Sequence, residues 1–172
     1  MNSTLLRRWV TTALFTALVT IGTMIIQIPT PATEGFINFG DAFVFLTGAL
    51  MGPIPGMLAG GIGSALADAL SGYTHYAPWT LAIKGLEGLL VGLIVYRNWH
   101  SQSKLAMPII GMTLAGAWMI LGYFISGSFM YGWKVALTSI PSNAIQAVGS
   151  VIITIPLLIP LRTALNNSRK NQ

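Results

Sequence analysis

The sequence contains no cysteine and few charged residues. Without cysteine, the chain can form no disulfide bond, no thiolate metal site and no cysteine nucleophile. Charged residues make up only 8% of the chain, whereas soluble domains contain about 25%. The composition therefore argues against a soluble globular domain.

The sequence also lacks the motifs of common nucleotide-dependent and hydrolytic enzymes. Its nearest approach to a phosphate-binding loop, GSFMYGWK at 127–134, has no lysine directly after the second glycine, where such a loop needs one. No serine elbow, HExxH or dinucleotide-binding pattern occurs, and His75 has no second histidine nearby with which to hold a metal. We predict a protein that is not an enzyme and that uses no cofactor or metal.

Hydrophobic residues are abundant, at 53% of 172 residues. A helix needs about 20 apolar residues to cross a bilayer, so about six spans fill the chain. We predict an all-α integral membrane protein in which residues 1–172 form a single six-helix domain. The first apolar run is interpreted as a retained helix, because it is longer than the apolar region of a signal peptide. The predicted spans are 9–28, 40–52, 54–72, 78–96, 105–125 and 135–161.

The distribution of lysine and arginine predicts the orientation, because these residues are retained on the cytoplasmic side. With an even number of spans both termini share one side, and the opposite side carries only Lys134. We therefore predict cytoplasmic termini in a multi-pass cell-membrane protein, with outer loops at 29–39, 73–77 and 126–134. The basic residues on the side of the termini are Arg7, Arg8, Arg97, Lys104, Arg162, Arg169 and Lys170.

Lys84 and Glu87 interrupt the predicted fourth span, within YAPWTLAIKGLEGLLVG at 76–92. At 1.5 Å per residue they lie about 9 and 13 Å below the outer surface. An ionisable side chain inside a bilayer costs about 2.5–3.5 kcal/mol, so such groups must face one another, a wet cavity or a ligand. Other polar side chains predicted at similar depth are Asp41, Asp68, Asn143 and Gln146.

Two interpretations of these polar groups remain open. Lys84 could pair with Glu87 or Asp68 only to hold helices together, or the groups could form a solute site reached from outside. We favour the solute site, because the polar groups are more numerous than a clasp requires. Tyrosines of the outer loops could stack on a flat heterocycle or belong to the interfacial aromatic belt. The predicted substrate-binding residues are Asn38, Asp41, Asp68, Tyr73, Tyr76, Lys84, Glu87, Tyr131, Asn143 and Gln146.

Small residues recur every four positions on three predicted spans. Such spacing lets helix backbones approach closely, and we expect internal packing faces on the third and fourth spans. Ala13 and Ala17 repeat the spacing on the first span, which could present this face to another protein. The residues on the third and fourth spans are Gly56, Gly60, Ser64, Gly88 and Gly92.

Three segments give the chain a resemblance to a known family. They are GFINFGDAFVFLTGALMGPIPGMLAGGIGSALADALSGY at 35–73, the continuation YAPWTLAIKGLEGLLVG, and SNAIQAVGS at 142–150. In this order they resemble the substrate-binding S components of energy-coupling factor (ECF) vitamin transporters, which are small six-helix membrane proteins of prokaryotic plasma membranes.

This resemblance implies a partner and a substrate class. Ala13 and Ala17 match the AxxxA motif with which such subunits dock on a transmembrane coupling subunit, and two ATPases on separate chains would supply the energy. The first outer loop would act as a gate. The sequence looks most like the branch that takes up hydroxymethylpyrimidine or pyridoxine-type vitamers, with riboflavin as a neighbour. Two alternatives remain open, a proton-coupled carrier that works alone and an intramembrane scaffold without a ligand.

Overall fold

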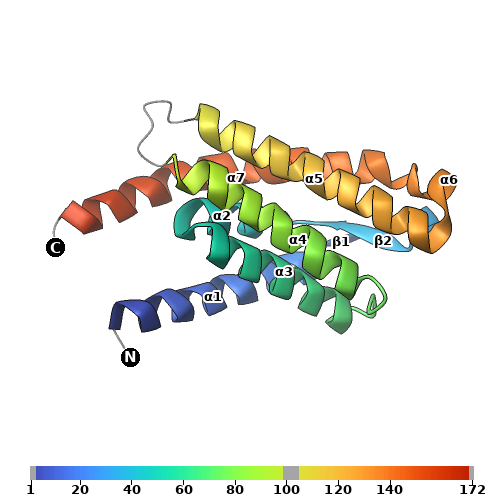
Figure 1. Ribbon diagram of the computed structural model, residues 1–172, viewed down its shortest axis with the longest axis horizontal. Coiled ribbons are helices and arrows are strands. Elements are labelled where there is room, and N and C mark those ends of the chain that lie inside the picture. Colours follow the sequence, from blue (N-terminus) through green and yellow to red (C-terminus); the bar gives the residue numbers. More distant parts are fainter. Residues whose placement is uncertain (1–2, 99–104, 171–172) are drawn as a thin grey trace.

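The computed structural model describes residues 3–98 and 105–170. Seven α-helices form within these residues, and the long ones run roughly along the long axis of the molecule (Figure 1). The helices are α1 (Ser3–Ile25), α2 (Gly40–Met51), α3 (Pro53–Leu70), α4 (Ala77–Val91), α5 (Ala106–Tyr131), α6 (Trp133–Ala136) and α7 (Ser139–Lys170). The start of α1 and the end of α7 lie at one end of the molecule, opposite α6 and the α3–α4 connection.

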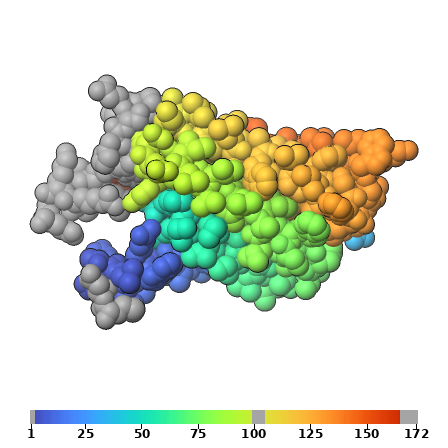
Figure 2. All heavy atoms as spheres, in the orientation of Figure 1, coloured from blue at the N-terminus to red at the C-terminus, as the bar shows by residue number. Residues whose placement is uncertain are grey.

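The connection between α1 and α2 is a β-hairpin, which the sequence did not predict. Strand β1 (Gln27–Thr30) pairs antiparallel with β2 (Gly35–Asn38), with a single 3-10 turn between them. Prolines and a glycine in this segment disfavour a helix, and strand pairing satisfies its backbone groups instead. The all-α prediction is correct for most of the chain and wrong here. Figure 2 shows that α4 and α5 cover the hairpin from this side, leaving only a few light blue atoms visible at the edge.

Several helices differ in length from the predicted spans. Helix α5 continues to Tyr131, so the predicted outer loop at 126–134 is largely helical. By contrast, α4 and the π-helical stretch Gly92–Tyr96 that extends it together agree with the predicted span 78–96. Within the described residues, four helices are long and apolar enough to cross a membrane, and α2 is a shorter apolar helix. Six membrane crossings therefore remain a prediction. The four are Ser3–Ile25, Ala77–Tyr96, Ala106–Tyr131 and Trp133–Ala164.

Helices α3 and α4 pack against each other along most of their length. A Cβ atom built on Gly60 would lie 2.5 Å from the backbone oxygen of Lys84, and one on Gly56 would lie 2.5 Å from that of Gly88. Because no side chain fits in these gaps, the two backbones can touch only where glycine occurs. The predicted packing faces of α3 and α4 are thus confirmed, and this contact fixes the backbone of α4 at Lys84.

Candidate functional site

A small polar cavity lies between the hairpin and four helices. Its volume is about 50 Å³. The hairpin closes one side of it, and residues of α3, α5, α7 and the first turn of α4 form the rest. The lining residues are Thr30, Thr33, Gly35, Phe36, Asn38, Asp68, Tyr76, Thr80, Tyr123, Gly127, Ser139, Ser142, Asn143 and Gln146.

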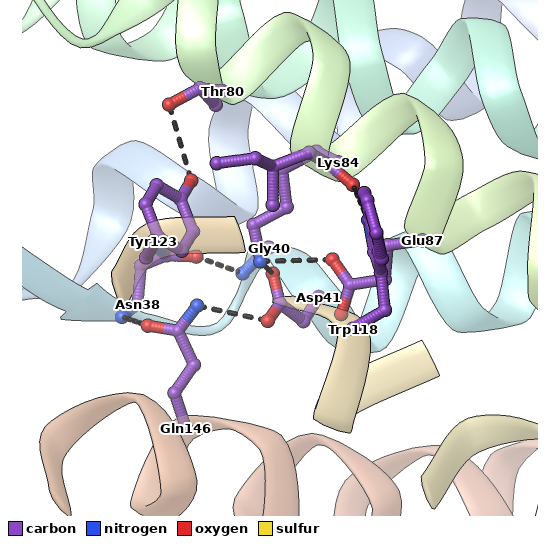
Figure 3. Close-up of polar contacts among 10 residues, drawn as sticks. Asn38, Gly40, Asp41, Thr80, Lys84, Glu87, Trp118, Tyr123 and Gln146 are labelled. Atoms are coloured by element: carbon purple, nitrogen blue, oxygen red, sulfur yellow. Dashed lines mark hydrogen bonds and ion pairs between the residues drawn. The ribbon is translucent and has the colours of Figure 1, made fainter. Parts of the chain in front are cut away.

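Next to the cavity, three ionisable side chains form a buried group that we call the ion cluster: Asp41, Lys84 and Glu87. Each is at most 1% exposed. Lys84 Nζ forms an ion pair with Asp41 Oδ1 and lies 3.0 Å from Glu87 Oε2 (Figure 3). The ammonium group also lies 5.6 Å from the centre of the Tyr123 ring. A buried charge is tolerated when it is paired in this way, so the pairing explains why the three groups can be buried.

Glu87 is the least well paired member of the ion cluster. Neither of its carboxylate oxygens has a hydrogen-bond partner within the described part of the chain. The contact of Oε2 with Lys84 is therefore an ion pair whose angles do not suit a hydrogen bond. Two carboxylates against a single ammonium leave the cluster one negative charge in excess if all three groups are ionised.

Gln146 joins the ion cluster to the hairpin. Its side-chain nitrogen donates to Asp41 Oδ2 over 2.9 Å, and its side-chain oxygen accepts a hydrogen bond from the backbone N–H of Asn38 over 2.8 Å. Asn38 in turn accepts a hydrogen bond from the Gly40 N–H at the start of α2. Figure 3 shows this chain of contacts running from the end of β2 to Lys84 and Glu87. One carboxamide on α7 thus connects a strand and a helix that are more than 100 residues away in sequence.

Tyr76 holds the turn of the hairpin. Its hydroxyl donates to the backbone oxygen of Thr33, in the turn between the two strands. Burial, with a smaller contribution from Tyr131, raises the pKa of this hydroxyl, so it keeps its proton and remains a donor at neutral pH. The hairpin is therefore attached to the helices at Thr33 and at Asn38. Gln27 of β1 adds a further hydrogen bond, which its side-chain nitrogen donates to the Ser71 hydroxyl over 3.0 Å.

The structure brings five predicted binding residues to the cavity wall: Asn38, Asp68, Tyr76, Asn143 and Gln146. The three members of the ion cluster do not line the cavity. Asp41, Lys84 and Glu87, which we predicted as substrate-binding residues, therefore lie beside the cavity and not on its wall. Of the two pairings considered for Lys84, the one with Glu87 forms, whereas Asp41 takes the place of Asp68.

The other two predicted tyrosines lie outside the cavity wall. Tyr73 packs its ring against Phe36 of β2, with ring centres 4.7 Å apart. Tyr131 places its hydroxyl 3.2 Å from His75 Nε2 and 3.5 Å from Glu34 Oε2. Both tyrosines therefore contact the hairpin and the neighbouring loop, and they reach the cavity only through these neighbours.

Sequence reasoning missed most of the hydroxyl groups on the wall. Thr80 and Tyr123 hydrogen-bond each other at 3.1 Å, and Ser139 and Ser142 belong to the first turn of α7. Serine and threonine are too frequent in membrane helices to stand out. A tyrosine inside an otherwise apolar helix was a usable signal, and so was the spacing of Thr80 one turn before Lys84.

Two further predictions concern metals and partners. Within the described residues, no group of three or more histidine or acidic side chains could hold a metal ion. Ala13 and Ala17 are exposed on α1, in a helix whose outer face also exposes Leu14 and Ile21. This face is available to lipid or to another protein, and the predicted docking role stays a prediction.

Comparison with known proteins gives one family and several relatives. Residues 3–163 match the model of the family described as ECF-type riboflavin transporter, S component. An uncharacterized protein of Pyrococcus woesei is 41% identical over 137 residues, which cover 78% of this chain and 88% of that protein. The thiamine precursor transporter HmpT of Lactococcus lactis is 29% identical over 162 residues, covering 92% of this chain and 90% of the relative.

A solved structure shares the fold. It is described as the S component of a bacterial ECF transporter, and it superimposes with a TM-score of 0.68 at 22% sequence identity. The superposition covers 92% of this chain and 97% of the other. At this identity the likeness concerns the arrangement of the helices and not the ligand.

Proposed function

The chain belongs to the family of ECF-type riboflavin transporter S components, and from this premise we propose that its polar cavity binds a small vitamin or vitamin precursor on the outer side of a cell membrane. The observation that carries the proposal is the cavity behind the hairpin, lined by hydroxyl, carboxamide and carboxylate groups from several helices. Such a polar wall does not stabilise helix packing, because unpaired polar groups inside a bilayer cost free energy. Its presence therefore favours a binding function.

Among the vitamin classes, a single small ring is the best match for the cavity. Its volume of about 50 Å³ is well below the roughly 300–1,000 Å³ of most ligand pockets. A one-ring heterocycle requires a modest displacement of the hairpin, whereas a three-ring flavin requires a much larger one. We therefore propose a hydroxymethylpyrimidine or pyridoxine-type substrate, in keeping with the similarity to a thiamine precursor transporter.

The hairpin is the proposed gate. It is attached to the helices through the side chains of Tyr76 and Gln146 and through the hydrogen bond from Gln27 to Ser71. Release of these contacts would open the cavity toward the end of the molecule away from the start of α1. With cytoplasmic termini, as the basic residues predict, that end faces outside. Transport would then need a coupling subunit, docked on the Ala13 and Ala17 face, and two ATPases on separate chains.

Ligand binding to the purified full-length chain tests this proposal. A ligand that binds only the native state raises its stability by RT ln(1 + [L]/Kd), so the melting temperature should rise with the correct vitamin. We expect a rise with hydroxymethylpyrimidine or pyridoxine. If the melting temperature stays constant with every member of a panel that also contains riboflavin and thiamine, the proposal fails.

One observation favours the alternative of a proton-coupled carrier that works alone. Glu87 is fully buried and its oxygens lack hydrogen-bond partners in the described residues, so it is the member of the ion cluster that would most readily take up a transported proton. Proteoliposomes that contain only this chain separate the two functions. Uptake driven by a pH gradient without ATP would support the carrier, whereas uptake that requires added coupling and ATPase subunits supports the S-component function.

A further inference from the structure

Asp68 is the only carboxylate or amine among the described residues that line the cavity. Its side chain comes from the last turn of α3, and the residue is 5% exposed. No ion pair reaches Asp68 in the described part of the chain. Thr80 can hydrogen-bond it, while Lys84 and His75 act on it electrostatically from beyond ion-pair distance. Its carboxylate is thus buried without a charged partner of its own.

Among the described residues of the cavity wall, no positive group balances Asp68. Lys84, the nearest basic side chain of the helices, is already engaged by Asp41 and Glu87. The rest of the wall consists of hydroxyl groups, carboxamides and apolar surface. A buried carboxylate without a charged partner costs free energy, and a ligand that supplies further donors or positive charge recovers it. The wall therefore favours a ligand edge that donates hydrogen bonds or carries positive charge.

Resting on the proposed function, we propose that Asp68 anchors the substrate through a ring nitrogen and an adjacent amino group, so that the substrate class is an aminopyrimidine. A carboxyl group and such an edge form two parallel hydrogen bonds. The amino group donates one of them, and the other contains a proton that belongs either to the ring nitrogen or to the carboxyl group. When the ring nitrogen is protonated, an ionised Asp68 accepts both bonds. When the ring is neutral, a protonated Asp68 donates to the ring nitrogen and accepts from the amino group. Paired bonds of this kind give geometric specificity as well as affinity.

This anchor discriminates against two related classes of ligand. In pyridoxine the ring nitrogen and the phenolic hydroxyl are separated by a methylated carbon, so Asp68 can contact only one of them. A phosphate ester would bring negative charge into a cavity whose only charged group is also negative, and no described basic residue on the wall could compensate. The transported form is therefore the free, unphosphorylated aminopyrimidine.

The first test uses the unmodified chain and calorimetric titration in detergent. We expect hydroxymethylpyrimidine, which has an amino group beside a ring nitrogen, to bind at least about tenfold more tightly than its desamino analogue, because about one charge-assisted hydrogen bond separates them. Its phosphate ester should bind more weakly still. Equal affinity for the amino and desamino compounds would overturn the inference without any substitution.

The second test measures the binding of both ligands to chains substituted at Asp68. Asp68→Ala should weaken hydroxymethylpyrimidine by roughly 10- to 100-fold and the desamino analogue by less than about threefold, because the analogue has already lost one of the bonds. Asp68→Asn should stay within about tenfold of the natural chain for hydroxymethylpyrimidine, because an amide also offers one donor and one acceptor. Lys134→Met removes an exposed charge that lies outside both the cavity wall and the hairpin, and it serves as the control.

The outcomes separate this inference from the proposed function. If Asp68→Ala weakens both ligands equally, Asp68 only maintains the cavity and the inference is wrong. If the natural chain prefers pyridoxine, the proposed function stands and the aminopyrimidine assignment is overturned. If it prefers riboflavin, vitamin binding stands, but both the aminopyrimidine assignment and the proposed one-ring substrate are overturned. If the natural chain binds no vitamin at all, both fail.

Discussion

Lys84 in the ion cluster and Asp68 on the cavity wall are both ionisable and both nearly inaccessible, with 1% and 5% of their surface exposed. They differ in their charged partners. Lys84 directs its charge to Asp41 and Glu87, whereas Asp68 has no ion pair within the described residues. The difference indicates that burial alone does not identify a binding residue. A binding residue is identified by burial together with a charged group that has no ion pair and faces a cavity.

The same difference predicts that substitutions lower stability at the ion cluster and weaken ligand binding at Asp68. Removing one member of a buried ion pair leaves the other charge uncompensated and costs about 3–5 kcal/mol. Removing a carboxylate that has no charged partner also removes its desolvation penalty, so stability changes little while binding suffers. Natural binding sites commonly show this conflict between stability and function.

The largest expected effect follows from Lys84→Met. This change leaves Asp41 and Glu87 buried without their shared cation, and we expect the free energy of unfolding to fall by about 3–5 kcal/mol. Unfolding by a denaturing detergent, followed by circular dichroism, would measure the loss. Lys134→Met at the surface is the control and should change stability by less than about 0.5 kcal/mol. Equal effects at the two lysines would show that the ion cluster does not stabilise the fold.

A matched pair of carboxamide substitutions tests the comparison most directly. Asp41→Asn weakens the pairing with Lys84, and we expect a loss of about 1.5–3 kcal/mol of stability, the usual value for a hydrogen bond to a charged group. Asp68→Asn should change stability by less than about 1 kcal/mol, because no ion pair is lost. The same unfolding measurement serves both variants. A larger loss at Asp68 than at Asp41 would reverse the roles assigned to the two carboxylates.

Two glycine substitutions ask whether helix contact fixes the position of the ion cluster. Gly60→Ala places a Cβ atom 2.5 Å from the backbone oxygen of Lys84, and we expect a cost of about 1–3 kcal/mol from overpacking. Gly149→Ala in α7 has open space around the new atom and should stabilise the helix by up to about 1 kcal/mol. Effects of the same sign in the melting temperature would argue against the close approach of α3 and α4.

The smallest expected effect concerns the hairpin. Tyr76→Phe removes the hydrogen bond to the backbone oxygen of Thr33, and we expect it to cost about 0.5–1.5 kcal/mol. The loss should be local, so faster amide hydrogen exchange in β1 and β2 is the appropriate measurement, with the amides of α3 as the internal reference. Unchanged exchange in the hairpin would contradict its attachment at Tyr76.

Much of the fold could be predicted because its signals are local. Apolar runs of the right length indicated the long helices, and glycines spaced by four indicated the contact of α3 with α4. The hairpin could not be predicted in this way. Its strands are four residues each, too short for alternation to be distinguished from a loop, and it is held by side chains far away in sequence.

The site was predicted in outline and mistaken in detail, because its outline depends on local signals and its details depend on contacts between distant parts of the chain. Depth along a helix follows from residue number, so the sequence by itself determined that Asp41, Lys84, Glu87 and Gln146 gather in one layer. Depth does not specify which side of a helix meets which neighbour. Only the tertiary structure decided that Lys84 faces Asp41 while Asp68 faces the cavity, because ion pairing depends on the rotation and spacing of whole helices, and contacts distant in the chain set both.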